Sequence, residues 1–196
     1  YCSAFGDVDA PFGSCGSFVT FAPQCGSYQV NPPFVSAIID ASAERIISLL
    51  TAAQQRGNAL AFAVVLPGWT DCNGYCQLLQ AKRFLRRSLL VAALDHGFVD
   101  GGQHLRRRTY RESPYDTMLF LMQTDAAAAA DPIDDEALGR LEASLAACTP
   151  SKEELAQVES RERVHRGGGA RKKRRKMKRA GTKTKAWATK HARKQA

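Results

Sequence analysis

Residues 31 to 34, Asn-Pro-Pro-Phe, combine two hydrogen-bond acceptors with an aromatic ring. The side-chain oxygen of Asn31 and the backbone carbonyl of Pro32 could both accept hydrogen bonds from one exocyclic amine. Such bonds would draw the nitrogen lone pair out of conjugation with a base and toward an electrophile. Two consecutive prolines restrict the backbone, so the acceptors have little freedom left to lose. The ring of Phe34 would stack on the base that carries the amine.

An apolar strand that runs into Asn-Pro-Pro-aromatic is similar to the active-site signature of amino-group methyltransferases. This similarity predicts that Asn31, Pro32, Pro33 and Phe34 form a catalytic site. Asn-Pro-Pro is also well suited to an ordinary turn, and a purely structural role is therefore the alternative.

The segments around this tetrapeptide predict a strand followed by a helix. A short apolar stretch that ends with residues 26–30 leads directly into Asn31. After the tetrapeptide, apolar residues recur at intervals of three and four, which predicts an amphipathic helix over residues 34–55 that ends near Gly57. The apolar positions are Val35, Ile38, Ile39, Ile46, Ile47 and Leu50.

A second strand is predicted over residues 59–66, which are almost all apolar and are closed by Pro67-Gly68. A run of this kind is typical of a strand buried on both faces of a parallel sheet. Strand, tetrapeptide, helix and strand together make half of a doubly wound α/β unit. The fold class expected is therefore α/β, with the tetrapeptide at the carboxyl end of its strand, where such sheets bind ligands.

The other segments carry weaker patterns. Residues 1–25 are rich in glycine and serine and predict loops with at most one strand over 17–21. Residues 117–124 predict another buried strand, whereas 84–94 fit either a helix or a strand. Further expected features are a linker or helix start in the alanine run 126–130, a helix over 132–147, and a capping box of Ser151 with Glu154 that starts another helix.

Charge divides the 196-residue chain into two parts. Residues 161–196 hold 16 of the 28 lysines and arginines and one acidic residue, whereas residues 1–160 carry a net charge of −6. The second part is also nearly without large apolar groups except Trp187, so it cannot bury enough surface to fold alone. We expect a folded domain over residues 1–160 and a disordered basic tail over 161–196.

The basic tail contains a dense cluster of cations after three glycines. Such a cluster suits a nuclear-import signal read by an import receptor, or a nonspecific phosphate-binding arm for RNA. A solvated tail without a partner is the alternative. The residues expected to contact RNA are Arg171, Lys172, Lys173, Arg174, Arg175 and Lys176.

A second basic stretch and one tryptophan are further candidates for RNA contact. Arg83 lies among Lys82, Arg86 and Arg87, with apolar residues between them, and could line a groove for an RNA backbone. Charges on one face of an amphipathic element are as often merely solvated. Trp69 directly follows a predicted strand and turn, and it could stack on a base or belong to the core.

Cysteine spacing and hydropathy argue against several classes of protein. The six cysteines follow no disulfide framework, and we expect reduced thiols. Cys72 and Cys76 with His96 and His104 lack zinc-finger spacing, so no metal site is expected. No apolar run approaches the roughly 20 residues needed to cross a bilayer, and no secretory signal is visible. An intracellular protein without a membrane span is expected.

Several short segments together resemble the cap-specific adenosine N6-methyltransferases of the phosphorylated-CTD-interacting-factor family. The resemblance covers roughly residues 1–145 and depends on Tyr1 to Phe5, Phe12-Gly13-Ser14, Phe21-Ala22-Pro23, Gly26-Ser27, Asn31 to Phe34, Pro67-Gly68-Trp69, Arg83-Phe84 and Gln103-His104. It implies the C-terminal part of a Rossmann-like methyltransferase that uses S-adenosylmethionine to methylate N6 of 2′-O-methyladenosine beside the mRNA cap, in the nucleus. Asn31 would also contact the methionine part of the cofactor.

The chain also departs from this family. Members have an upstream cofactor-binding strand and a helical cap-recognition region, and animal members have a WW domain that implies contact with the phosphorylated C-terminal domain of RNA polymerase II. We expect these outside this chain, which begins at Tyr1 and suggests a fragment. Gly13-Ser14-Cys15-Gly16 is too weak to replace a Gly-x-Gly cofactor loop. Two alternatives remain: an inactive RNA-binding protein with this fold, and an enzyme acting on another amino group.

Overall fold

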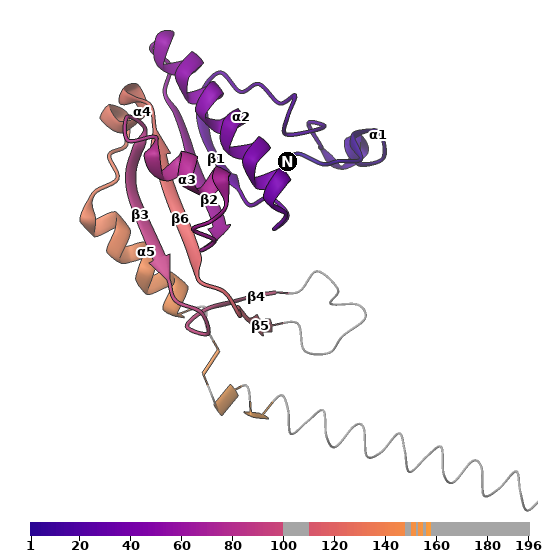
Figure 1. Ribbon diagram of the computed structural model, residues 1–196, viewed down its shortest axis with the longest axis vertical. Helices are drawn as coiled ribbons and strands as arrows, with labels where there is room; N and C mark the ends of the chain where they lie inside the picture. Colours follow the sequence, from indigo (N-terminus) through magenta and orange to yellow (C-terminus); the bar gives the residue numbers. More distant parts are fainter. Residues whose placement is uncertain (100–109, 148–149, 152, 155, 158–196) are drawn as a thin grey trace, which may run out of the picture. The chain divides into compact units, whose positions relative to one another are not determined.

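The computed structural model describes residues 1–99, 110–147, 150–151, 153–154 and 156–157. The chain divides into two compact units, one of residues Tyr1–Phe98 with Tyr110–Thr149, and one of Val99–Thr109 with Pro150–Ala196. The first unit holds a four-stranded sheet and its helices, and it contains the tetrapeptide 31–34 (Figure 1). The tail cluster 171–176 lies outside the described residues, as do His104 and the stretch 106–108.

The strand, helix and strand around the tetrapeptide form as predicted. Strand β1 (Gly26–Val30) pairs in parallel with β2 (Leu60–Pro67), and helix α2 (Ser36–Gln55) connects them. The helix begins at Ser36, two residues later than predicted, because Val35 keeps an extended backbone after the prolines. The helix ends in a Schellman motif, in which Asn58 N–H donates to Ala53 O and Gly57 adopts a φ of 70°.

The sheet is mixed. The second strand, β2, was expected in a parallel sheet, and it pairs in parallel with β1 but antiparallel with its other neighbour. The strand order is β1-β2-β6-β3, with β6 (Thr117–Gln123) antiparallel to both β2 and β3 (Leu85–Val91). Apolar content alone could not reveal this, since a strand buried on both faces has the same composition in either direction. The fold is α/β with a mixed sheet, which is compatible with a methyltransferase-like fold.

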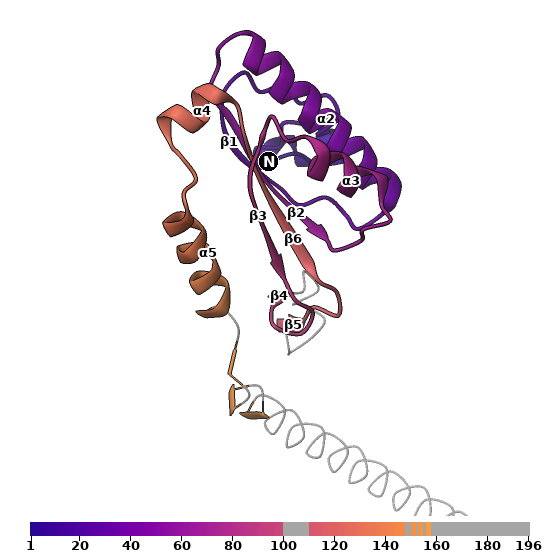
Figure 2. The same cartoon turned by 60° about the vertical axis from the view of Figure 1, so that its left-hand side comes forward.

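The core lies between one face of this sheet and two helices. Helix α2 and helix α3 (Asn73–Gln80) lie on the same face of the sheet (Figure 2). Alternate residues of β2 and β6 point into this layer, and Phe62 and Phe120 are at most 2% exposed. They pack against Ile46 and Leu50 of α2, which are fully buried. Helix α3 was not predicted, because its eight residues bury only Gly74, Tyr75 and Leu78.

The remaining elements agree in part with the sequence patterns. The segment 84–94 forms a strand, β3, and no strand forms over residues 17–21, which are turns and loop. The alanine run is a helix, α4 (Asp125–Ala130), and the next helix, α5 (Asp135–Ala147), begins three residues after Pro132. Short elements that the sequence did not predict are α1 (Gly6–Asp9), a 3-10 turn η1 (Ala10–Phe12), β4 (Gly97–Val99) and β5 (Tyr110–Glu112).

The second unit is described only in part, but its capping box is confirmed. Ser151 N–H donates to a carboxylate oxygen of Glu154 at 2.8 Å, and Glu154 N–H donates to Ser151 Oγ at 3.2 Å. These bonds lower the pKa of Glu154. No described helix of either unit is long and apolar enough to span a membrane.

Candidate functional site

The tetrapeptide leaves β1 at the carboxyl end of the strand, as predicted. Asn31 is exposed, and within the described chain its side chain makes no hydrogen bond. The carbonyl of Pro32 likewise receives no hydrogen bond from a described residue. The next carbonyl, of Pro33, accepts from Val35 N–H at 2.8 Å and fixes the turn into α2. Two acceptors on a restrained backbone therefore remain open to a ligand.

Three aromatic rings from distant parts of the chain meet, and one of them is Phe34, the last residue of the tetrapeptide. The ring centroids of Phe34 and Trp69 are 6.3 Å apart with planes at 70°, and those of Trp69 and Tyr115 are 6.0 Å apart at 87°. Phe34 is 42% exposed and Tyr115 is 50% exposed, whereas Trp69 also packs against the core. Trp69 therefore packs against the core, which is one of the two roles considered for it, and its indole also contacts two exposed rings; stacking on a base stays a prediction.

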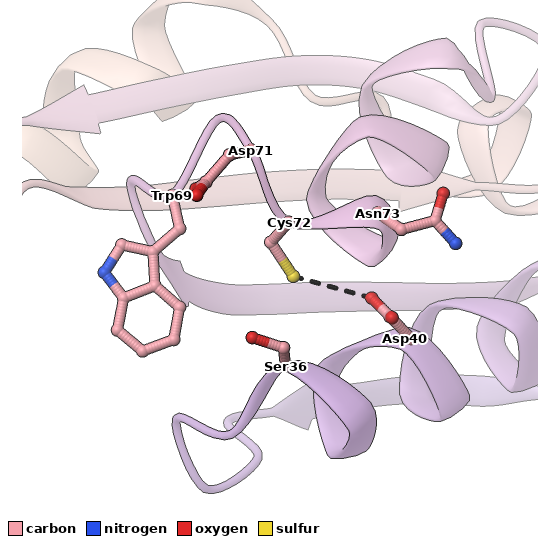
Figure 3. A pocket seen from close by; sticks show the side chains of 6 residues that line it. All are labelled: Ser36, Asp40, Trp69, Asp71, Cys72 and Asn73. Carbon is pink, nitrogen blue, oxygen red and sulfur yellow. Dashed lines mark hydrogen bonds between the residues drawn. The ribbon is translucent and has the colours of Figure 1, made fainter.

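An open cavity of about 400 Å³ adjoins this cluster (Figure 3). Helix α2 contributes Ser36 and Asp40, and the loop after β2 with the start of α3 contributes Trp69, Asp71, Cys72 and Asn73. Asp40 is held in place because Oδ1 accepts from Gly74 N–H at 2.6 Å and lies 3.5 Å from Cys72 Sγ. A cavity of this size can hold a nucleobase or part of a nucleoside, and its carboxylates favour groups that donate hydrogen bonds.

The loop that carries Trp69 lies very close to the segment that carries Tyr115. Gly68 N–H donates to Asp116 O at 2.7 Å, and a Cβ atom on Gly68 would lie 2.8 Å from Asp116 Cβ. Only glycine permits this approach, and the approach brings the two aromatic rings together. Asp116 also acts on the core, because burial raises the pKa of Tyr75 and the nearby Cys76 and Asp116 add to that rise.

We therefore expect Gly68→Ala to lower the free energy of unfolding by about 1–3 kcal/mol, since the added methyl group must push the Asp116 segment away. Urea unfolding measures this change, and the emission of Trp69 in a Trp187→Phe background reports the displacement of the ring. The matched control is Gly139→Ala in α5, where a Cβ atom meets nothing within 4 Å. That change should leave stability unchanged or raise it by up to about 1 kcal/mol. Equal effects of the two changes would contradict this packing.

The basic stretch at the start of β3 lies at the other end of the sheet. Because β2 and β3 both pair antiparallel with β6, they run in the same direction, and β3 starts where β1 and β2 start. Arg83 therefore is not brought together with Asn31 and instead lies over the ring of Phe84, 5.7 Å from its centroid. Its two neighbours are engaged in ion pairs, Arg86 with Asp125 at 2.7 Å and Arg87 with Asp135 at 3.2 Å.

The cysteines in the described chain are all free, which agrees with the expectation of reduced thiols; they are Cys2, Cys15, Cys25, Cys72 and Cys76. Among the described residues, no group of three or more His, Cys, Asp or Glu side chains could hold a metal ion.

Several residues of the site could not be found from the sequence. Tyr115 lies 81 positions after Phe34, and its only local signal is the Ser113-Pro114 turn in front of it. Asp40 is a polar residue inside an amphipathic helix, where a solvated side chain is the ordinary expectation. Both join the site through long-range packing: α2 against α3, and Gly68 against Asp116.

Comparisons with known proteins agree with the resemblance found in the motifs. Residues 1–101 match the sequence model described as the phosphorylated CTD interacting factor 1 WW domain, although a WW domain was expected outside this chain. The human protein named mRNA (2′-O-methyladenosine-N(6)-)-methyltransferase is 32% identical over 128 residues, 64% of this chain and 18% of its own length. The mouse protein of the same name is 31% identical over 126 residues, 63% of this chain and 17% of its own length.

The chain thus corresponds to less than a fifth of the length of these two relatives. The residues matched by the family model include β1, the tetrapeptide, α2, β2 and α3, and these elements position the open acceptors and two of the three clustered rings. A match over more than half of the chain shows that it belongs to the phosphorylated CTD interacting factor 1 family.

Proposed function

We propose that this chain provides the substrate-binding half of a methyltransferase that methylates N6 of 2′-O-methyladenosine next to the mRNA cap. The observation that carries the proposal is the pair of open acceptors, Asn31 Oδ1 and Pro32 O, beside exposed aromatic rings at the carboxyl end of β1. The names of the human and mouse relatives supply the adenosine substrate and the reaction.

In this proposal Asn31 and Pro32 act on the amine of the adenine. Each accepts one N–H of the amino group, so the nitrogen lone pair turns out of the plane of the base and toward the methyl donor. The bonds strengthen as positive charge develops on the nitrogen during transfer, and they therefore stabilise the transition state more than the ground state. No base needs to remove a proton before the methyl group moves.

Phe34 holds the adenine in position. Its ring touches Trp69 at an angle of 70° and remains 42% exposed, so it can receive the face of a base. A base stacked on an aromatic side chain gains roughly 1–3 kcal/mol, which is enough to select an unpaired nucleotide. Trp69 contacts the ring of Phe34, and the prolines limit movement of the backbone between the ring and the acceptors.

S-adenosylmethionine would supply the methyl group. Of the described residues, Asn31 fits the contact with its methionine part, because the exposed amide has both a donor and acceptors and no partner among the described side chains. The fit is partial, since a glycine-rich cofactor loop is not found among residues 1–99. The remaining cofactor contacts would come from the upstream region of the family.

The same proposal extends to the fold and the partners. The parallel β1-α2-β2 unit supports assignment as the C-terminal part of a Rossmann-like sheet.

Arg83 and the cluster 171–176 would contact the RNA backbone, and the cluster would also bind an import receptor that brings the protein to the nucleus. The family name points to the phosphorylated C-terminal domain of RNA polymerase II as a further partner.

The test is methyl transfer from labelled S-adenosylmethionine to a short capped RNA that begins with 2′-O-methyladenosine. This chain and the product of the full-length transcript are assayed side by side, with uncapped RNA and DNA as competing substrates and mass spectrometry to locate the methyl group. N6-methylation by the full-length product supports the proposal. Transfer by neither protein, with RNA binding intact, would instead indicate an inactive binding module.

A further inference from the structure

We infer that Tyr115 is a second base-stacking residue of this site, which receives the nucleotide adjacent to the methylated adenosine. The inference rests on the proposed function and adds that the site reads two successive unpaired bases. Nothing in the family match names Tyr115, which lies outside the matched residues 1–101.

Two of the three clustered rings, Phe34 and Tyr115, are exposed. Trp69 contacts both Phe34 and Tyr115 edge-to-face, with the ring planes at 70° and 87°. Phe34 is 42% exposed and Tyr115 is 50% exposed, so each ring has surface that a base can cover. We assign one base to each of these two exposed rings.

The backbone of Tyr115 is also held in place by Ser113, which suits a binding residue. Ser113 is 5% exposed, and its hydroxyl donates to Tyr115 O at 2.8 Å and lies 3.4 Å from Tyr115 N. Ser113 N–H in turn donates to His96 O at 2.9 Å. The backbone of Tyr115 is thereby fixed, while half of its side chain stays exposed. A preorganised aromatic ring loses little entropy when a base stacks on it.

The charge near Tyr115 favours a base over a phosphate. Asp116 is the next residue, and the adjoining cavity is lined by Asp40 and Asp71. These carboxylates repel phosphate oxygens, whereas stacking on a ring does not require a cation. Binding of successive bases on aromatic rings is typical of proteins that hold single-stranded nucleic acid.

The experiment uses the 196-residue chain with Trp187→Phe, so that Trp69 is its only tryptophan. Two probes are titrated against Trp69 emission: the nucleoside 2′-O-methyladenosine, and an uncapped RNA trinucleotide that begins with it. Tyr115→Ala should raise the Kd of the trinucleotide about tenfold and leave that of the nucleoside unchanged. Tyr115→Phe should stay within about twofold for both probes, because the ring and not the hydroxyl is used.

Two controls make the outcome decisive. Phe98→Ala removes a ring of similar exposure, 51%, from β4 and should change neither Kd. Titration at two salt concentrations separates the contribution of the basic tail to RNA binding from that of stacking, because the tail's contribution falls as the salt concentration rises. An unchanged trinucleotide Kd in Tyr115→Ala, or an equal loss for both probes, would overturn this inference alone. A further outcome is that the trinucleotide changes Trp69 emission with a Kd that depends on Tyr115, while the full-length product transfers no methyl group. In that case the stacking site stands and the methylation proposal fails.

Discussion

Replacing Asn31 by alanine is expected to lower methyl transfer to capped RNA by about 10²–10³-fold, the loss typical of removing one preorganised hydrogen-bonding group from a transition state. The side chain is exposed and makes no hydrogen bond within the described residues, so its removal should leave the free energy of unfolding within about 0.5 kcal/mol. The loss should appear in kcat and in kcat/KM alike, because the acceptor acts mainly when positive charge develops on the amine.

Two variants of the full-length product complete this test. Asn31→Asp keeps an acceptor oxygen at the same place and should retain more activity than alanine, since the amine can still donate to it. Gln29→Ala removes an exposed amide two residues upstream on β1 and should leave transfer within about twofold of the parent, as expected for a surface change. Retention of parental activity by Asn31→Ala would rule out this role for the tetrapeptide.

The parts of the fold that local sequence determines were predicted well. Apolar runs and three-to-four spacing located β1, α2, β2 and β6 to within two or three residues. The direction of β6 was not predictable, because a buried strand has the same composition whether its neighbours run parallel or antiparallel. Helix α3 was also missed: it has eight residues, and Asp40 of another helix binds its first turn by accepting from Gly74 N–H.

Some residues of the candidate site could likewise be found from the local sequence, and others could not. Asn31 to Phe34 could be found because their chemistry lies in four consecutive residues, and Trp69 because it follows a strand and a turn. Tyr115 and Asp40 depend on contacts between segments far apart in the chain, which no local pattern encodes. Arg83 has a local pattern that suits RNA contact, but it does not lie near Asn31. Because β3 runs in the same direction as β2, Arg83 at the start of β3 lies at the end of the sheet away from Asn31.

The largest effect on stability outside the apolar core is expected from Thr124→Val. Thr124 is fully buried, and its hydroxyl donates to Asn58 O at 2.9 Å while accepting from Leu60 N at 3.1 Å and Ala127 N at 3.3 Å. One side chain thus joins the start of β2 to the first turn of α4. Valine fills the same volume but leaves these groups without their partner, which should lower the free energy of unfolding by about 2–4 kcal/mol.

The control for this prediction is Thr124→Ser, which keeps the hydroxyl and removes only a methyl group. It should cost about 1 kcal/mol, as expected for one buried methyl group, so the ratio of the two losses separates hydrogen bonding from packing. Urea unfolding followed by Trp69 emission and by circular dichroism measures both. Equal losses for valine and serine would mean that the buried hydroxyl contributes no more than the methyl group, which would contradict this prediction. If valine alone is destabilising, the hydroxyl is what ties β2 to α4, at the end of the sheet opposite the aromatic cluster.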